Sequence, residues 1–322
     1  MSETQFEIGL HASIVAIDGI DPLVLTVPED DGQTTLPALP FGPFDPAVHR
    51  TMEAGLRLWV EEQVHLSLGY VEQLYTFGDR GRVADKRQME KHFVSVGYLA
   101  LVRRKGQNRT EAQRGQWRSW YVHFPWEDWR TDKRELLETE ILPALYDWAA
   151  SDRDHEPTRI ARIKLAFASD GPADVTIDRR SWDEERVLER YELMYEAGLV
   201  EEAVTDQKMS GLRISKGLGA PLAHDHRRIL ATAIARLRAK LKYRPVVFEL
   251  MPEEFTLTEL QKTVESLSGK TVHKQNFRRL VEKTNLVEPT GSSRPETGGR
   301  PAALFRFMRT ITRERPVPGL RV

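Results

Sequence analysis

The sequence predicts a multidomain α+β protein, with a strand-rich first part, a folded middle segment, a basic helix and a C-terminal winged helix-turn-helix. Three observations predict it. The chain has 322 residues, more than one ordinary hydrophobic core holds. Strand-like alternation dominates before residue 125, and helical spacing dominates from residue 225. Residues 1–79 hold thirteen acidic and two basic residues (net −11), whereas residues 270–315 hold four acidic and eleven basic residues (net +7).

The composition excludes several classes of protein. Hydrophobic residues make up 40% and charged residues 30%, which is typical of a soluble globular protein. No apolar run reaches membrane-spanning length, and residues 1–10 lack the basic start and apolar stretch of a signal peptide. The absence of cysteine excludes disulfides, thiolate metal sites and a cysteine nucleophile. We therefore expect a cytoplasmic protein with no membrane partner.

The strand-rich first part begins with two strands over 6–26, joined by turn chemistry at 18–22. We expect a Pro/Gly-rich loop over 36–46. A helix should follow, with Asp45 as its cap and Pro46 at its first position. Further strands are expected over 69–78, 93–102 and 117–124, with a polar loop over 79–92.

The middle segment gives weaker signals. Residues 136–150 have a helical pattern, residues 160–168 are compatible with a strand, and residues 184–202 predict a second helix. Trp148 and Trp182 indicate that the segment is folded. Residues 208–221 are glycine-rich and predict a linker.

The C-terminal part has clear helix signals. A basic helix is expected over 225–243, ended by Pro245. Thr256 and Glu259 form a capping box for a helix that stops at Gly269. A second helix over 273–285, strands over 286–289 and 303–307, and a loop between them complete the order of a winged helix-turn-helix.

The second of these helices has the side chains of a DNA reader. Phe277, Leu280 and Val281 form its apolar face. Arginine reads guanine, asparagine and glutamine read adenine, and lysine neutralises phosphate. The candidate DNA-binding residues are Lys274, Gln275, Asn276, Arg278, Arg279 and Lys283, with Arg294 and Arg300 on the hairpin tip. The alternative is a small helical domain with a solvated basic face. The concentration of basic residues on one unit favours DNA.

Several C-terminal segments resemble a known family. They are residues 245–261, 276–279 and 298–302, together with Asp225-His226 and residues 237–243 of the preceding helix. These segments are similar in sequence to the Nudix-related transcriptional regulators of NAD metabolism. The resemblance implies a Nudix-like α/β/α mixed-sheet domain over 1–129, an insertion of unknown function over 130–222, a linker helix over 223–244 and a winged helix domain over 245–322.

The resemblance extends to the front of the chain, where residues 69–79 and 94–102 look like strands beside a Nudix helix. Nudix hydrolases use a box with clustered glutamates, because pyrophosphate hydrolysis needs a divalent metal held by hard oxygen ligands. Aligned on Arg57, the box keeps Glu61 and Glu62 as candidate metal ligands. Pro43, His49, Leu58 and Val64 replace its first glycine, first glutamate, a helix glutamate and its last glycine. Leu58 in particular predicts weak Mg²⁺ binding and no catalytic residues.

Nucleotide binding is the property that this altered box would retain. Tyr75 and Phe77 share one strand face and could stack on adenine, and Asp79 and Arg80 follow at its end. Arg57 and Arg80 are candidates for pairing with pyrophosphate. The alternative is that Tyr75 and Phe77 are core residues, because alternating aromatic residues in a strand usually pack.

The sequence as a whole favours a DNA-binding regulator, a repressor of NAD biosynthesis or salvage genes controlled by ADP-ribose or a related nucleotide, with no required cofactor. The resemblance and two-fold symmetry together imply a homodimer on a palindromic operator. One alternative is an active Nudix pyrophosphatase on ADP-ribose-like substrates with a DNA-binding tail. Another is a nucleotide-sensing module whose tail binds protein.

Overall fold

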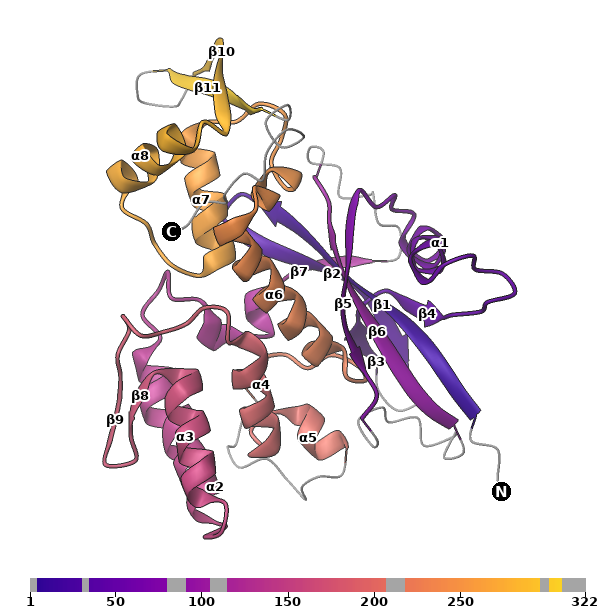
Figure 1. Ribbon diagram of the computed structural model, residues 1–322, viewed down its shortest axis with the longest axis vertical. Helices are drawn as coiled ribbons and strands as arrows, with labels where there is room; N and C mark the ends of the chain where they lie inside the picture. The colour runs from indigo at the N-terminus through magenta and orange to yellow at the C-terminus, as the bar shows by residue number, and fades with distance from the viewer. Residues whose placement is uncertain are drawn as a thin grey trace.

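The computed structural model describes residues 5–30, 35–79, 91–104, 115–206, 218–295 and 301–308. Its first part is a mixed seven-stranded sheet with the order β3-β2-β1-β6-β5 (Figure 1). β4 also pairs with β1, and β7 with β2. The strands are β1 Gln5–Asp18, β2 Asp21–Asp30, β3 Thr35–Ala38, β4 Phe41–Pro43, β5 Tyr70–Phe77, β6 Lys91–Leu101 and β7 Gln116–Ser119. β1 runs parallel to β6, and its other partners are antiparallel.

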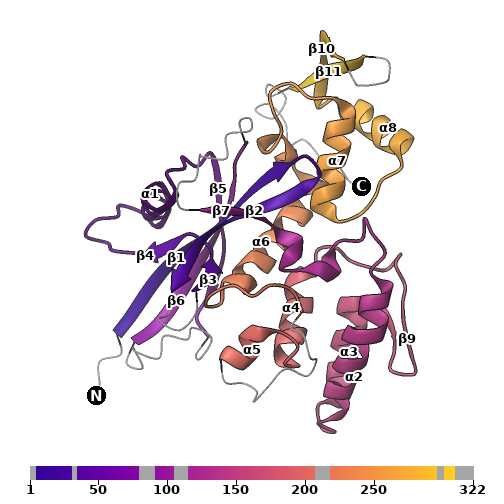
Figure 2. The same cartoon turned by 180° about the vertical axis from the view of Figure 1, so that it is seen from behind.

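Helices cover both faces of this sheet, as period-two alternation along β1 requires. Leu10, Ala12 and Ile14 belong to a core shared with α1 (Met52–Val64). Val15 lies on the opposite face, in the core that holds the apolar residues of α6 (His226–Tyr243). Figures 1 and 2 show α1 and α6 on opposite sides of the sheet. The basic helix predicted as a linker is therefore also one layer of this sandwich.

The middle segment is helical and packs on the outer side of α6. It contains a π-helical stretch at Leu136–Ile141, α2 Leu142–Ala150, α3 Glu156–Phe167, the short hairpin of β8 Ser169–Gly171 and β9 Asp174–Ile177, α4 Val187–Glu196 and α5 Glu201–Thr205. α4 contacts α6 closely. One continuous hydrophobic core joins this segment to the sheet and to the C-terminal part.

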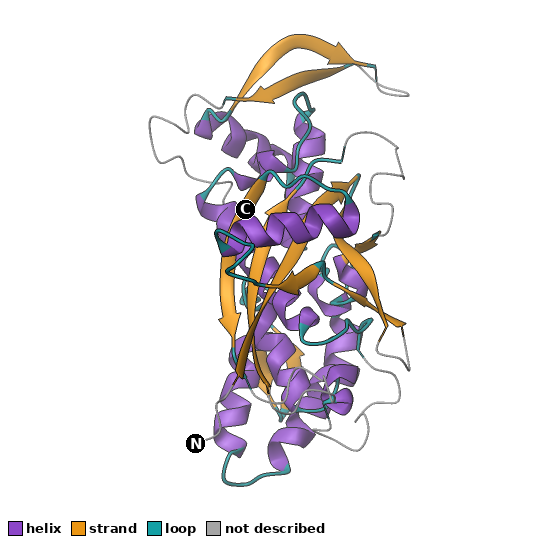
Figure 3. Ribbon diagram, turned by 90° about the vertical axis from the view of Figure 1, so that its right-hand side faces the viewer, coloured by secondary structure: helices purple, strands orange, loops and turns teal. Residues whose placement is uncertain are grey.

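The C-terminal part has the predicted winged-helix order. A 3-10 turn at Val246–Glu249 leads into α7 (Leu257–Ser268), α8 (Lys274–Thr284) and the hairpin of β10 (Val287–Arg294) and β11 (Ala302–Phe307). The capping box is formed, since Thr256 Oγ1 accepts from the Glu259 N–H and the Glu259 carboxylate accepts from the Thr256 N–H. α7 ends at Gly269, whose φ of +74° suits glycine. Figure 3 shows the hairpin projecting at one end of the molecule.

Two predictions near α1 were wrong. The helix begins at Met52 with Thr51 as its cap, because Asp45 caps only an isolated turn, through Ala47 N–H to Asp45 Oδ1 at 2.8 Å. The loop expected over 36–46 contains the edge strands β3 and β4, whose prolines are compatible with edge positions.

Three further expectations failed in or before the middle segment. The strand expected over 117–124 ends at Ser119 and becomes a 3-10 turn that buries Trp120 and exposes Val122. Residues 160–167 lie in α3 and Ala168 is its C-cap, because Ile160, Ile163 and Phe167 follow helical spacing. The helix expected over 184–202 is interrupted at Gly198, which has a φ of +70°. Within the described ranges, no helix is long and apolar enough to cross a membrane.

Candidate nucleic-acid interface and effector cavity

The exposed face of α8 is the candidate nucleic-acid interface. Phe277 and Val281 are buried against α7, which fixes the roll of α8. The other predicted α8 residues all face solvent: Lys274, Gln275, Asn276, Arg278, Arg279 and Lys283. Arg279 donates to Asn276 Oδ1 at 2.6 Å, so these two side chains are already ordered on the surface. Their roles in base reading stay predictions.

The hairpin beside α8 holds the remaining predicted DNA contacts. Arg294 ends β10 and forms an ion pair with Glu259 Oε1 at 2.7 Å, in the capping box of α7. Arg306 on β11 pairs across the hairpin with Glu288 at 2.6 Å. Arg300 falls outside the described residues.

The remnant of the Nudix box holds β4 against α1. The Trp59 ring occupies the space above Gly42, where a Cβ would clash with it, and Trp59 Nε1 donates to Pro43 O at 2.9 Å. Gln63 donates to Phe41 O at 2.7 Å and accepts from Phe41 N–H at 3.1 Å. The packing of Trp59 on β4 therefore requires a glycine at position 42, next to Pro43, because any side chain there would overlap the Trp59 ring.

The positions of the box that would bind metal are structural or exposed. His49, in place of the first glutamate, is buried, and its Nδ1 accepts from Asp45 N–H at 3.0 Å. Glu61, Glu62 and Leu58 lie on the outer side of α1. The part of the chain that the structure describes contains no cluster of three or more His, Asp or Glu side chains that could hold a metal ion.

The predicted nucleotide-binding residues do not gather in one place. Arg57 pairs with Glu53 and donates to the carbonyls of Leu68 and Gly69, so it holds the chain that leaves α1. Tyr75 is 62% exposed, whereas Phe77 is 5% exposed.

The Arg228 guanidinium of α6 lies 4.7 Å from the Phe77 ring centroid and pairs with Asp79 at 2.6 Å. Phe77 and Asp79 therefore attach β5 to the start of α6. Arg80 falls outside the described residues.

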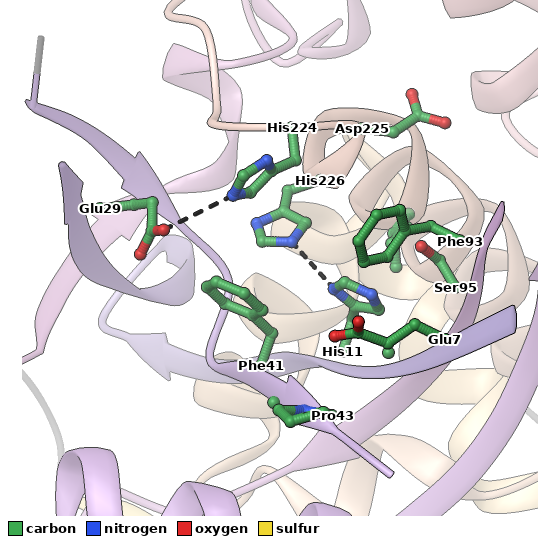
Figure 4. Close-up of a pocket in the computed structure, with 13 residues that line it drawn as sticks. Glu7, His11, Glu29, Phe41, Pro43, Phe93, Ser95, His224, Asp225 and His226 are labelled. Carbon is green, nitrogen blue, oxygen red and sulfur yellow. Dashed lines mark hydrogen bonds and ion pairs between the residues drawn. The ribbon is translucent and has the colours of Figure 1, made fainter. Parts of the chain in front are cut away.

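A cavity of about 220 Å³ lies beside this attachment, between β1, β4, β6 and the first turn of α6 (Figure 4). Phe41, Gly42, Pro43 and Phe93 supply much of its apolar wall. Its acidic residues are Glu7, Glu29 and Asp225, and its histidines are His11, His224 and His226. The cavity touches the Nudix-box strand β4, which makes it the candidate effector site.

His11 and His226 of this cavity are uncharged at neutral pH, because burial lowers the pKa of each. Burial, together with the nearby His224, lowers the pKa of His11 to about 3. Burial also lowers the pKa of His226 well below its ordinary value. His226 Nε2 and His11 Nδ1 are 2.8 Å apart and share a hydrogen bond.

Sequence reasoning missed this cavity, because its walls come from positions more than 200 residues apart. In the sequence, Asp225-His226 was noted only as part of the resemblance to a known family and not as part of a binding site. One usable signal was present: Gly9, His11 and Ser13 place small or polar residues on the α6-facing side of β1, ahead of Val15. Such an interruption of an apolar face is compatible with a cavity beneath the covering helix.

A buried ionic cluster connects the middle segment, α6 and the winged helix. Glu127, 1% exposed, accepts from Arg190 of α4 at 2.6 and 3.0 Å and from Arg238 of α6 at 2.7 Å. Burial alone would raise the pKa of Glu127, but Arg190 and Arg238 outweigh it and lower the pKa.

The same cluster contacts the end of α7. Arg238 donates to Leu267 O at 3.0 Å, and Tyr121 Oη donates to Ser266 O at 2.7 Å. A Cβ on Gly269 would collide with the Glu127 carbonyl. The C-terminal end of α7 is therefore fixed by side chains of α6 and of the sheet domain's last segment.

A second group of charges supports this junction. Glu184 binds Lys242 of α6 at 2.7 Å and Lys270, just after α7, at 2.5 Å. Although burial opposes it, hydrogen bonds from Lys242 and Lys270 lower the pKa of Glu184 to about 2.

Comparison with known proteins agrees with this architecture. Residues 247–307 match the family model described as the NrtR DNA-binding winged helix domain. The "ADPR responsive transcriptional repressor NtrR" of Acinetobacter baylyi is 42% identical over 94 residues, which are 29% of this chain and 37% of that protein. The matched part of the chain thus spans little more than a third of this relative's length.

Several solved structures match nearly the whole chain. One is Shewanella oneidensis NrtR complexed with a 27mer DNA, with a TM-score of 0.55, 21% identity and 98% of each chain covered. Another is a MutT/nudix family protein from Enterococcus faecalis, with a TM-score of 0.52, 16% identity and coverage of 96% of this chain and 88% of that one. These likenesses show a Nudix-like domain followed by a winged helix, as the sequence predicted.

Proposed function

We propose that this protein is a DNA-binding transcriptional regulator, a repressor of NAD biosynthesis or salvage genes, whose Nudix-like domain binds ADP-ribose or a related nucleotide. The observation that carries the proposal is the exposed basic face of α8, set on a winged helix of the NrtR type. Arg278 and Lys283 form no ion pair among the residues described, so both are available to phosphates or base edges. The repressor with 42% identity supports the choice of ligand.

The position of α6 supports control of this interface by the cavity. Its first turn supplies cavity-lining Asp225, His226 and Ile229. Arg238, twelve residues further on and about 18 Å along the axis at 1.5 Å per residue, holds the end of α7. A tilt of α6 on ligand binding would therefore displace α7 and α8. In a homodimer, whose half-sites must lie about one DNA turn apart, such a displacement would weaken operator binding.

This proposal keeps the four-part organisation of the chain and includes no hydrolase activity. Leu58 and His49 stand where the box needs carboxylates, and Glu61 and Glu62 are exposed. A metal that keeps most of its water shell binds poorly when ligands are lost. The alternative of an active pyrophosphatase is thus not favoured by any contact in this region.

The test is a mobility shift of the full chain on its own upstream DNA, with and without ADP-ribose. We expect ADP-ribose to lower DNA affinity by about 1–3 kcal/mol, the usual size of a coupling energy. Reciprocity requires that the same DNA weaken ADP-ribose binding by the same factor in calorimetry. Failure of the full chain to shift any DNA at low salt would refute the regulator. Equal ADP-ribose affinity with and without DNA would refute ADP-ribose as the effector.

A further inference from the structure

Two buried ring nitrogens in the effector cavity, His11 Nε2 and His224 Nε2, have no hydrogen-bond partner among the described residues, and the backbone fixes the protonation of the first. The Leu39 N–H, which can only donate, lies 3.0 Å from His226 Nδ1, so this nitrogen accepts. A neutral imidazole has its proton on the other nitrogen, so His226 Nε2 donates to His11 Nδ1. By the same rule His11 carries its proton on Nε2. The backbone N–H of Leu39 thus selects the tautomer of His226 and, through the hydrogen bond between the two rings, that of His11.

The resulting N–H of His11 is a donor without an acceptor. His11 is 7% exposed, and its Nε2 has no hydrogen-bond partner among the residues that the structure describes. Gly9 leaves this nitrogen uncovered, since a Cβ at that position would lie 2.8 Å from Nε2. Buried polar groups nearly always have partners, so an unpaired donor on a cavity wall indicates an acceptor atom on a ligand.

The other walls limit what this ligand can be. Glu7, Glu29 and Asp225 carry negative charge, and none of the described lining residues is a lysine or arginine. Arg228, which does not line the cavity, compensates Asp225 at 3.3 Å, but no described lining cation would face a phosphate, so the cavity does not favour one. The rings of Phe41 and Phe93, on either side of the His11–His226 pair in Figure 4, give the cavity an apolar, aromatic wall that suits the uncharged part of a ligand. The volume of about 220 Å³ is below the 300–1,000 Å³ of sites for whole drug-sized ligands, so only part of a nucleotide fits.

We propose that this cavity takes the uncharged nucleoside end of a nucleotide, and that His11 Nε2–H recognises an acceptor atom on its base or sugar. The pyrophosphate then lies outside the cavity. The presence of a nucleotide rests on the proposed function, whereas the direction of the hydrogen bond rests on the two histidines alone.

The experiment is calorimetry on the full chain with three probes: ADP-ribose, adenosine and inorganic pyrophosphate. We expect adenosine to compete with ADP-ribose, and pyrophosphate not to displace adenosine. His11→Phe keeps a ring but removes the donor. Gly9→Ala keeps both histidines but places a methyl group against Nε2, from which the His11 ring must shift. Each should weaken ADP-ribose and adenosine about 5- to 150-fold, because a buried acceptor on the ligand loses its partner.

His123→Phe is the matched control, since His123 is also buried with an unpartnered Nε2 but does not line the cavity. It should leave both affinities unchanged. Unchanged binding by Gly9→Ala and by folded His11→Phe would overturn the inference, as would displacement of adenosine by pyrophosphate, or no adenosine binding at all. Ring ¹⁵N shifts that place the His11 proton on Nδ1 would overturn the tautomer argument.

The two proposals fail separately. Binding of adenosine that depends on His11, without any binding of ADP-ribose, would keep this subsite and refute the proposed effector. Binding of ADP-ribose with equal affinity by the wild type and both cavity variants would keep the effector and refute the subsite.

Discussion

Glu127→Gln should destabilise the protein strongly, because Glu127 is the carboxylate between two buried guanidinium groups. Arg190 and Arg238 are both fully buried and lie 2.6 and 2.7 Å from it. Breaking a buried ion pair by removing one partner costs about 3–5 kcal/mol, since the remaining charge stays buried without compensation. Here two like charges would remain, so we expect a loss of at least this size from the free energy of unfolding. That is a large share of the 5–15 kcal/mol typical of folded proteins.

The assay is urea unfolding followed by tryptophan fluorescence, which reports directly on this site because the Arg190 guanidinium lies 4.0 Å from the Trp182 ring centroid. Glu140→Gln is the matched control: Glu140 is exposed and forms no ion pair within the described part of the chain, so its substitution should change stability by less than about 0.5 kcal/mol. A loss below 1 kcal/mol for Glu127→Gln would refute the reasoning.

The pH dependence gives a second check on the same variant. The pKa of Glu127 is lowered in the folded protein from an ordinary value of 4.5. A group of this kind contributes its full stabilisation above its unfolded pKa and loses it as the pH falls through the folded pKa. The difference between wild type and Glu127→Gln should therefore be constant from pH 7 to about 4.5 and shrink only below that value. A difference that instead grows on acidification would contradict the sign of this shift.

Three further predictions concern the interface, the junction and the altered Nudix box. Arg278→Ala should cost about 1–3 kcal/mol of operator affinity and relax specificity at one base pair, whereas Lys283→Ala should weaken all DNA alike and reduce the salt slope by about 0.9; titrations at several salt concentrations separate them. Gly269→Ala should lower stability by at least about 1–2 kcal/mol, because its φ is +74° and its Cβ meets the Glu127 carbonyl; thermal unfolding measures this. Purified protein should release little or no AMP from ADP-ribose with Mg²⁺, and brisk release that disappears in Glu62→Gln would contradict this prediction.

The C-terminal part of the structure was largely predictable from local signals. The capping box at Thr256 and Glu259, the stop at Gly269 and the apolar face of α8 are all confirmed. Each depends on residues a few positions apart, whose interaction is fixed by helix geometry. The same locality explains why the exposed face of α8 was correctly identified.

The errors arose where tertiary contacts outweigh local preference. Asp45-Pro46 is a strong helix start by itself, yet the packing of His49 and Trp59 around β4 delays the helix to Met52. The short segment 160–168 was compatible with a strand, and the packing of α3 against α2 and α4 selects the helix, in which Ile160, Ile163 and Phe167 share one face.

The sequence alone thus determined the winged helix, its basic face, the resemblance to a Nudix-type regulator and the altered metal box, because these follow from residue types at short spacing. Only the tertiary structure decided that α6 is a layer of the sandwich, that Glu127 joins α4, α6 and α7, and that His11 meets His226 in a cavity. The physical reason is chain separation: His11 and His226 are 215 residues apart, and no local periodicity reports a hydrogen bond across that distance.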